Sequence, residues 1–258
     1  MAESQSNRVM DAETKGPAWK SLYKISGACA LIVAGLYMTE FVLFGAFGAG
    51  PAPNTANDWF MLLQHNSLLG LFMLNLLDLP AFALMIPVFL GLYGALRRAN
   101  EAYSALALVF IYIGIAVYYA SNVAFAMLFL SDQYVAATTD TQRSLLLAAG
   151  QALLAVGQGT GAWMWSILFS AGGVIISVIM LRSMIFGNVT AYVGIAANVL
   201  GLGPYIIAYV LAPAASILII LVAGVLLLLW FVLIGRTLLQ LGRGASTEEI
   251  SVAESHSG

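Results

Sequence analysis

Six long apolar runs, separated by short polar segments, dominate this sequence. They extend over residues 25–48, 60–96, 103–130, 144–181, 190–211 and 215–234. A membrane-spanning helix needs about 20 apolar residues, so every run is long enough to cross a bilayer. Hydrophobic residues make up 61% of the chain and charged residues 9%, which leaves too little polar surface to cover a water-soluble globule. The sequence therefore predicts an all-α polytopic membrane bundle with six transmembrane helices.

The basic residues lie on alternate sides of these runs. Nine of the ten would gather on one face of the membrane, and Arg143 alone falls on the other. The nine are Arg8, Lys15, Lys20, Lys24, Arg97, Arg98, Arg182, Arg236 and Arg243. Positive charge near span ends is retained in the cytoplasm, so the pattern predicts cytoplasmic N and C termini. The net charge of -2, without a basic patch typical of nucleic-acid binding, argues against a nucleic-acid partner.

The domain organisation follows from the same pattern. Residues 1–24 are expected to form a cytoplasmic tail, and residues 25–236 the six-helix transmembrane domain. Residues 237–258 are expected to form a second cytoplasmic tail, mostly disordered, because the stretch from Gly244 is rich in Ser, Glu and Gly.

The second and fourth runs are longer than one bilayer thickness, since at 1.5 Å per residue each would extend roughly 55 Å. Both end at a cytoplasmic arginine, so the excess is expected on the extracytoplasmic side. It would form helical extensions or separate helices at the interface. Asn57 or Asp58 can cap the second element, and Asp140 or Thr141 the fourth.

The first half of the fourth run has one polar face and three closely spaced glycines. The face consists of Ser144, Gln151 and Gln158, and the glycines are Gly157, Gly159 and Gly161. The polar face can lie on lipid headgroups or dock on the extension of the second run. The sequence leaves open whether residues 144–157 are external, interfacial or re-entrant. The glycines either break the helix or let another helix approach closely, and close approach is the commoner reason.

Two carboxylates, Glu40 and Asp78, fall inside the runs. A buried acid in a membrane is costly and is a functional candidate by default. Helical rise places them, with other polar and helix-breaking residues, in the outer half of the bilayer. The candidate ligand-binding residues are Glu40, Asn75, Asp78, Tyr119, Asn122, Gln158, Trp163 and Tyr205. On one continuous helix, Gln64, Asn75 and Asp78 would share a polar edge. Equally, the two carboxylates can serve only as hydrogen-bonded packing groups.

Metal and cofactor chemistry is weakly indicated. Glu40, His65 and Asp78 form a possible carboxylate-rich metal set, although nothing in the sequence brings them together. One histidine near the membrane excludes a haem with two axial histidines. The lack of Cys and His ligands excludes structural zinc. The sequence identifies no other cofactor.

Several spaced motifs resemble those of a prokaryotic family of six-span integral membrane proteins of unknown function. The motifs are LLDLP at 76–80, LSDQY at 130–134, AATTD at 136–140, and FG at 186–187 followed by TAYVG at 190–194. The resemblance extends from about Lys20 to Gly242. It implies a prokaryotic cell membrane, and it supplies no substrate, cofactor or catalytic residue.

Three functions remain open. In the first, the protein binds or conducts a small or lipid-like ligand through a cavity in the outer half of the bilayer. In the second, it is a non-catalytic subunit or scaffold that docks a membrane protein or another copy of itself. In the third, it is an intramembrane lipid-modifying enzyme with Glu40 or Asp78 as general acid or base.

Overall fold

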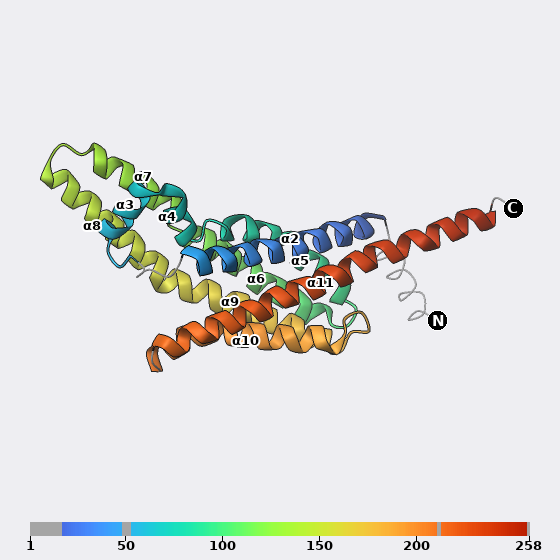
Figure 1. The fold of residues 1–258 in the computed structure, drawn as a ribbon. Coiled ribbons are helices and arrows are strands. Elements are labelled where there is room, and N and C mark those ends of the chain that lie inside the picture. Colours follow the sequence, from blue (N-terminus) through green and yellow to red (C-terminus); the bar gives the residue numbers. More distant parts are fainter. Residues whose placement is uncertain (1–16, 48–52, 211–212, 257–258) are drawn as a thin grey trace. The chain divides into compact units, whose positions relative to one another are not determined.

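The computed structural model describes residues 17–47, 53–210 and 213–256, with side chains at 19–46, 53–157, 159–202 and 218–243. Within these ranges every regular element is a helix and no strand occurs (Figure 1). The helices are α2 (Pro17–Phe47), α3 (Ala56–His65), α4 (Ser67–Met73), α5 (Asp78–Leu96), α6 (Glu101–Ser121), α7 (Ala124–Ala136), α8 (Asp140–Val156), η1 (Gly157–Gly161), α9 (Ala162–Met180), α10 (Asn188–Val210) and α11 (Pro213–His256).

Five helical stretches are long and apolar enough to cross a membrane. They are Trp19–Ala46, Asp78–Leu96, Glu101–Ala136, Asp140–Met180 and Leu218–Arg243. The part of α10 with described side chains adds a shorter apolar stretch, Asn188–Leu202. The predicted class, an all-helical multi-pass membrane protein, is confirmed at this level.

The helices divide into two compact units, which are described separately. Unit 1 comprises Met1–Gly35, Ala83–Tyr112 and Phe169–Gly258, and unit 2 comprises Leu36–Phe82 and Ile113–Leu168. Helices α2, α5, α6 and α9 contribute residues to both.

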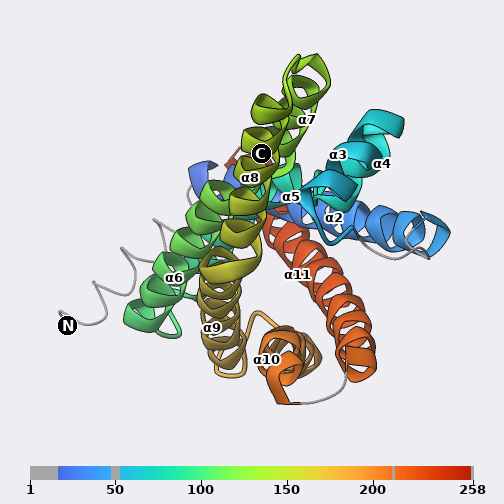
Figure 2. The same ribbon diagram turned by 90° about the vertical axis from the view of Figure 1, so that its left-hand side faces the viewer.

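In unit 1, helices meet at glycines. A Cβ added at Gly27 of α2 would lie 2.8 Å from the Leu239 backbone nitrogen and 2.9 Å from the Gly235 carbonyl oxygen of α11, so these two backbones nearly touch. The Ser26 hydroxyl donates to the Pro87 carbonyl at 2.6 Å and so links α2 to α5. Helix α10 packs along α11 (Figure 2).

Aromatic rings fill the centre of unit 1. Phe89, Trp230 and Phe231 are fully buried. The Phe89 ring meets Phe169 edge-on, with centroids 5.5 Å apart, and lies 6.2 Å from Trp230. Large aromatic rings fill the space between the helices where no glycine allows the backbones to approach closely.

Helix α11 runs from Pro213 to His256 and so continues across residue 237, where the C-terminal tail was expected to begin. Leu238 and Gly242 are buried, and Gly27 approaches Leu239. The leucines beyond Arg236 extend the apolar face of the helix and pack it on α2.

In unit 2, helices α3, α4, α7 and α8 enclose a separate apolar core. Its buried residues are Ala56, Trp59, Phe60, Leu63, Leu71, Leu74, Ala124, Met127 and Leu154. The second run is therefore divided among separate helices, one of the two forms expected for its excess length. Asn66 ends α3 and starts α4, with its side chain accepting from the Leu69 N–H at 3.0 Å. A turn at 74–77 then precedes α5.

Helix caps lie close to the predicted ones but use other residues. Thr55, not Asn57 or Asp58, is the N-cap of α3. The Asp58 N–H donates to the Thr55 hydroxyl oxygen at 3.2 Å, and the Thr55 N–H donates to the Asp58 carboxylate at 3.1 Å. Hydrogen bonds from the Thr55 side chain and backbone hold the pKa of Asp58 below its ordinary value of 3.8. Thr139, not Asp140 or Thr141, caps α8 and accepts from the Gln142 N–H.

Both explanations for the glycines of the fourth run apply. Gly159 has φ −88° and ψ −126°, which is not helical, so the chain breaks between α8 and α9. Gly157 and Gly161 allow close approach, since a Cβ at Gly157 would lie 3.2 Å from Val123 and one at Gly161 would collide with Ser121. The third run also breaks, at Asn122 and Val123, although one span over 103–130 was expected.

One residue of the polar face of α8 docks on the first helix of the second run. The Ala56 N–H of α3 donates to the Gln151 side-chain oxygen at 3.2 Å. Gly150 lies against Phe60 and Ala56. Ser144 is exposed, and the Gln158 side chain lies outside the described residues.

Candidate functional site

A polar network surrounds the Tyr118 hydroxyl in unit 2. This hydroxyl is hydrogen-bonded to the Asp78 carboxylate and lies 3.4 Å from the Asn75 carbonyl oxygen. The Asn122 side-chain amide donates to the Tyr118 oxygen at 3.2 Å. Residues from α5, from α6 and from the two helix breaks at 74–77 and 122–123 thus meet at one phenol.

The second carboxylate belongs to the same network. Glu40 of α2 interacts electrostatically with Asp78, and Tyr37, one turn earlier on α2, interacts with both. The side chains of Glu40 and Asp78 are half-buried. Two carboxylates near each other in an apolar surrounding repel, so the arrangement favours a cation or a hydrogen-bond donor beside them.

Aromatic packing fixes the position of Tyr118. Its ring stacks on Phe82, with centroids 4.0 Å apart and planes 5° apart. Trp165 of α9 meets it edge-on at 5.5 Å. Tyr118 is 5% exposed, so its hydroxyl is held in place while the neighbouring carboxylates stay partly accessible.

Sequence reasoning selected Tyr119 and missed Tyr118 and Tyr37. The Tyr119 hydroxyl donates to the Leu79 carbonyl at 2.5 Å, close to the start of α5. The signal for Tyr118 was its spacing of four residues from Asn122, which places both side chains on one helical face. Trp165 also packs on Tyr118 and was not among the predicted site residues.

The two candidate asparagines have backbone roles. Asn75 adopts φ 64°, the only positive φ of a residue other than glycine in the described part of the chain, and its side chain is exposed. Asparagine tolerates this left-handed conformation better than most residues. The Asn122 side-chain oxygen accepts from the Ala124 N–H at 3.1 Å, at the start of α7. The backbone of Asn75 and the side-chain amide of Asn122 thus belong to the breaks that frame the network.

Other predicted residues lie elsewhere. Gln64 donates to the Ser131 hydroxyl at 2.8 Å, and two helix breaks separate it from Asp78, so the expected polar edge of Gln64, Asn75 and Asp78 does not exist. Trp163 is half-buried in the first turn of α9. The side chain of Tyr205, like that of Gln158, lies outside the described residues.

The weak metal set is not assembled. His65 is exposed at the end of α3. Among residues with described side chains, no three His, Cys, Asp or Glu groups are placed to hold a metal ion. The Glu40–Asp78 pair therefore lacks the third ligand that the sequence had offered.

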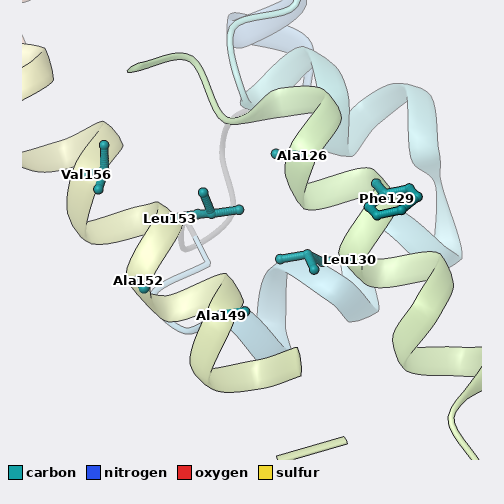
Figure 3. Close-up of a pocket in the computed structure, with 7 residues that line it drawn as sticks. All are labelled: Ala126, Phe129, Leu130, Ala149, Ala152, Leu153 and Val156. Carbon is teal, nitrogen blue, oxygen red and sulfur yellow. The ribbon is translucent and has the colours of Figure 1, made fainter. Parts of the chain in front are cut away.

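A shallow apolar groove runs between α7 and α8 (Figure 3). Its volume is about 450 Å³, within the roughly 300–1,000 Å³ of small-molecule sites. The lining residues are Ala126, Phe129 and Leu130 of α7, and Ala149, Ala152, Leu153 and Val156 of α8. Small side chains on α8 and larger ones on α7 give the groove its depth.

The groove begins near the break between α6 and α7. Ala126 lies in the first turn of α7, four residues after Asn122, whose amide donates to the Tyr118 oxygen. Val156 directly precedes Gly157, which packs on Val123 in the same break. One end of the groove therefore lies next to the break that supplies Asn122 to the network. No family model, no curated protein and no solved structure matches this chain.

Proposed function

We propose that this membrane protein binds an amphipathic, lipid-like molecule in unit 2. Its alkyl chain would lie in the groove between α7 and α8, and its head would reach the Tyr118–Asp78–Glu40 network. The observation that carries the proposal is that an apolar groove begins one turn after Asn122, whose amide donates to Tyr118 of the network.

The chemistry of the network selects the head. Two carboxylates repel an anionic head and favour a cationic or hydroxyl-bearing one. Moving an alkyl chain from lipid into an apolar groove gains little hydrophobic free energy, because lipid tails are equally apolar. Selectivity therefore resides in the polar contacts, and the groove acts through shape.

The proposed arrangement in the membrane is that of six crossings in a prokaryotic cell membrane, with both termini cytoplasmic. Helix α10, with 23 residues, supplies the sixth crossing, since about 20 residues suffice. The alternation of basic residues supports this orientation. The network and the groove would then lie toward the extracytoplasmic side.

Three probes of one chain length test the head preference: oleylamine, oleyl alcohol and oleic acid. Binding to the purified protein in non-ionic detergent is measured by native mass spectrometry. We expect oleylamine to bind most tightly and oleic acid most weakly. Equal binding of amine and acid would contradict a role for the carboxylates.

Variants distinguish the contribution of the ligand's polar head to binding from that of its alkyl chain. Asp78→Asn should lower oleylamine affinity about ten- to a hundredfold, as expected for losing a charged hydrogen bond, and should leave oleyl alcohol nearly unchanged. Ala152→Phe fills the groove and should weaken both probes about tenfold. Ala148→Phe is the matched control, because Ala148 is an exposed alanine of α8 outside the groove. If Ala148→Phe weakened binding as much as Ala152→Phe, the groove would not be the site.

A second function, a scaffold that docks another membrane protein or a second copy, is favoured by one observation. Large apolar side chains stand out from unit 2, with Leu68 73% and Phe129 63% exposed. Failure of all three probes to bind, together with a defined oligomer in detergent, would favour this alternative over ligand binding.

A further inference from the structure

Positive charge from three helices converges at one end of unit 1. The Arg97 guanidinium of α5 lies 4.9 Å from the ring centroid of Trp19 on α2. Gly94, one turn earlier on α5, leaves room for the same indole, which a Cβ there would strike. Arg97 and Arg98 both act electrostatically on Tyr23 of α2. The beginning of α2 and the end of α5 are therefore packed together.

Helix α11 reaches the same place. A Cβ added at Gly242 would lie 2.6 Å from Cγ of Lys24 and 3.2 Å from the Lys20 carbonyl oxygen. Arg243 follows directly and is exposed. We call the five residues Lys20, Lys24, Arg97, Arg98 and Arg243 the basic cluster. Lys24, Arg98 and Arg243 are exposed, and Lys20 and Arg97 are half-buried.

We propose that the basic cluster binds the phosphate headgroup of an anionic phospholipid. Four of its members lie within two residues of the ends of three stretches that are long and apolar enough to cross a membrane, Trp19–Ala46, Asp78–Leu96 and Leu218–Arg243, and Lys24 lies about one turn inside the first. These ends lie at headgroup level when the helices span the bilayer. Guanidinium groups pair with phosphate oxygens through two parallel N–H bonds, and tryptophan favours the membrane boundary.

Lipid fits this cluster better than a soluble phosphate does. The Trp19 ring lies against the Arg97 guanidinium, and its indole offers an apolar wall for the glycerol backbone. Anionic headgroups gain roughly fivefold in affinity for each nearby Lys or Arg, which corresponds to about 1 kcal/mol. Removing two exposed members of the basic cluster should therefore weaken binding about 25-fold.

The test uses the purified full chain in non-ionic detergent with added phosphatidylglycerol, phosphatidylcholine of the same acyl chains, or inorganic phosphate. Native mass spectrometry measures the affinity of each lipid, and phosphate enters as a competitor. We expect phosphatidylglycerol to bind at least about tenfold more tightly than phosphatidylcholine. Equal affinity for the two lipids, or displacement of the lipid by millimolar phosphate, would overturn the proposal.

The double variant Lys24→Gln/Arg98→Gln should lose about 25-fold in phosphatidylglycerol affinity and keep its phosphatidylcholine affinity. Arg143→Gln/Arg182→Gln removes the same charge from exposed positions outside the basic cluster, and should change binding less than twofold. An equal loss in both double variants would mean diffuse surface charge and would overturn the site. If the first variant misfolds, ionic strength replaces it: in the unmodified protein, affinity must fall steeply between low and high salt, and a flat profile would overturn the proposal.

Discussion

Helices associate differently in the two units. In unit 1, α2 and α11 approach backbone to backbone at Gly27, and buried polar side chains such as Ser177 bond to their own helix. In unit 2, side chains cross between helices: Gln64 of α3 reaches Ser131 of α7, and Gln151 of α8 caps α3. Close approach at glycine joins α2 to α11 in unit 1, where the Ser26–Pro87 hydrogen bond also links α2 to α5. In unit 2, side-chain hydrogen bonds join several helices around an apolar core.

The difference carries over to function. Close backbone packing relies on many weak dispersion contacts. Hydrogen bonds between membrane helices contribute on average about 0.6 kcal/mol each, so a polar unit is adjustable. The candidate ligand network accordingly lies in unit 2, among interrupted helices.

The largest expected effect comes from adding one methyl group where unit 1 is tightest. Gly27→Ala should lower the free energy of unfolding by about 1–3 kcal/mol, because backbone atoms of α11 occupy the space. Gly35→Ala, on the same helix, meets nothing within 4 Å and should stabilise the protein by about 0.5–1 kcal/mol through helix propensity. Unfolding in mixed micelles of increasing SDS content measures both, and equal effects would show that shape does not hold unit 1.

A smaller effect is expected from removing a bridging hydroxyl in unit 2. The Ser131 hydroxyl donates to the Phe60 carbonyl at 3.2 Å and accepts from Gln64. Ser131→Ala should cost about 1–2 kcal/mol, since both partners lose a buried hydrogen bond. Ser177→Ala is the control from unit 1, equally buried but bonded within its helix. It should cost less than about 0.5 kcal/mol by the same SDS titration, and a larger loss than Ser131→Ala would reverse the comparison.

The smallest effect concerns the cap of α3 and depends on pH. Thr55→Ala should cost about 1 kcal/mol at neutral pH, as lost N-caps do. The folded pKa of Asp58 is lowered from 3.8, so its contribution is fully present above pH 4 and is lost as the pH falls through the lowered value. Hydrogen exchange of the α3 amides, compared between pH 5 and pH 3, should show this loss in the unmodified protein. In Asp58→Asn the same loss should be absent, and an unchanged pH response there would exclude the carboxylate as its source.

Hydrophobicity predicted the helical membrane class and most of the helix positions, because a bilayer requires long apolar helices. Hydrophobicity could not predict the breaks at Asn66, Asn75 and Asn122. A short turn surrounded by apolar residues has the same composition as a helix that continues through that position. Asn75 and Asn122 were candidate ligand residues. Asn66 is the N-cap of α4, and Asn122 accepts from the Ala124 N–H at the start of α7. One signal was present and overlooked: Thr55 and Asp58 have the spacing of a capping box.

The candidate site was partly predictable. The cost of carboxylates in a membrane singled out Glu40 and Asp78, and the structure brings them into electrostatic contact. Tyr118 and Tyr37 were missed, because tyrosines are common at membrane boundaries and their depth alone does not show which one turns inward. The apolar groove had no sequence signature, since alanines and leucines of α7 and α8 read the same whether exposed or packed.

The side-chain amide of Asn122 makes two hydrogen bonds. Its oxygen accepts from the Ala124 N–H in the first turn of α7, and its nitrogen donates to the Tyr118 hydroxyl oxygen. The Asn122 side chain thus links α7, which forms one wall of the groove, to Tyr118, which lies beside the carboxylates Asp78 and Glu40. A bound molecule that moves the Tyr118 phenol would break its hydrogen bond with the Asn122 nitrogen. Asn122 would then keep only its hydrogen bond to the first turn of α7. Binding of a ligand head at the polar network would in this way determine how firmly the α7 wall of the groove is held.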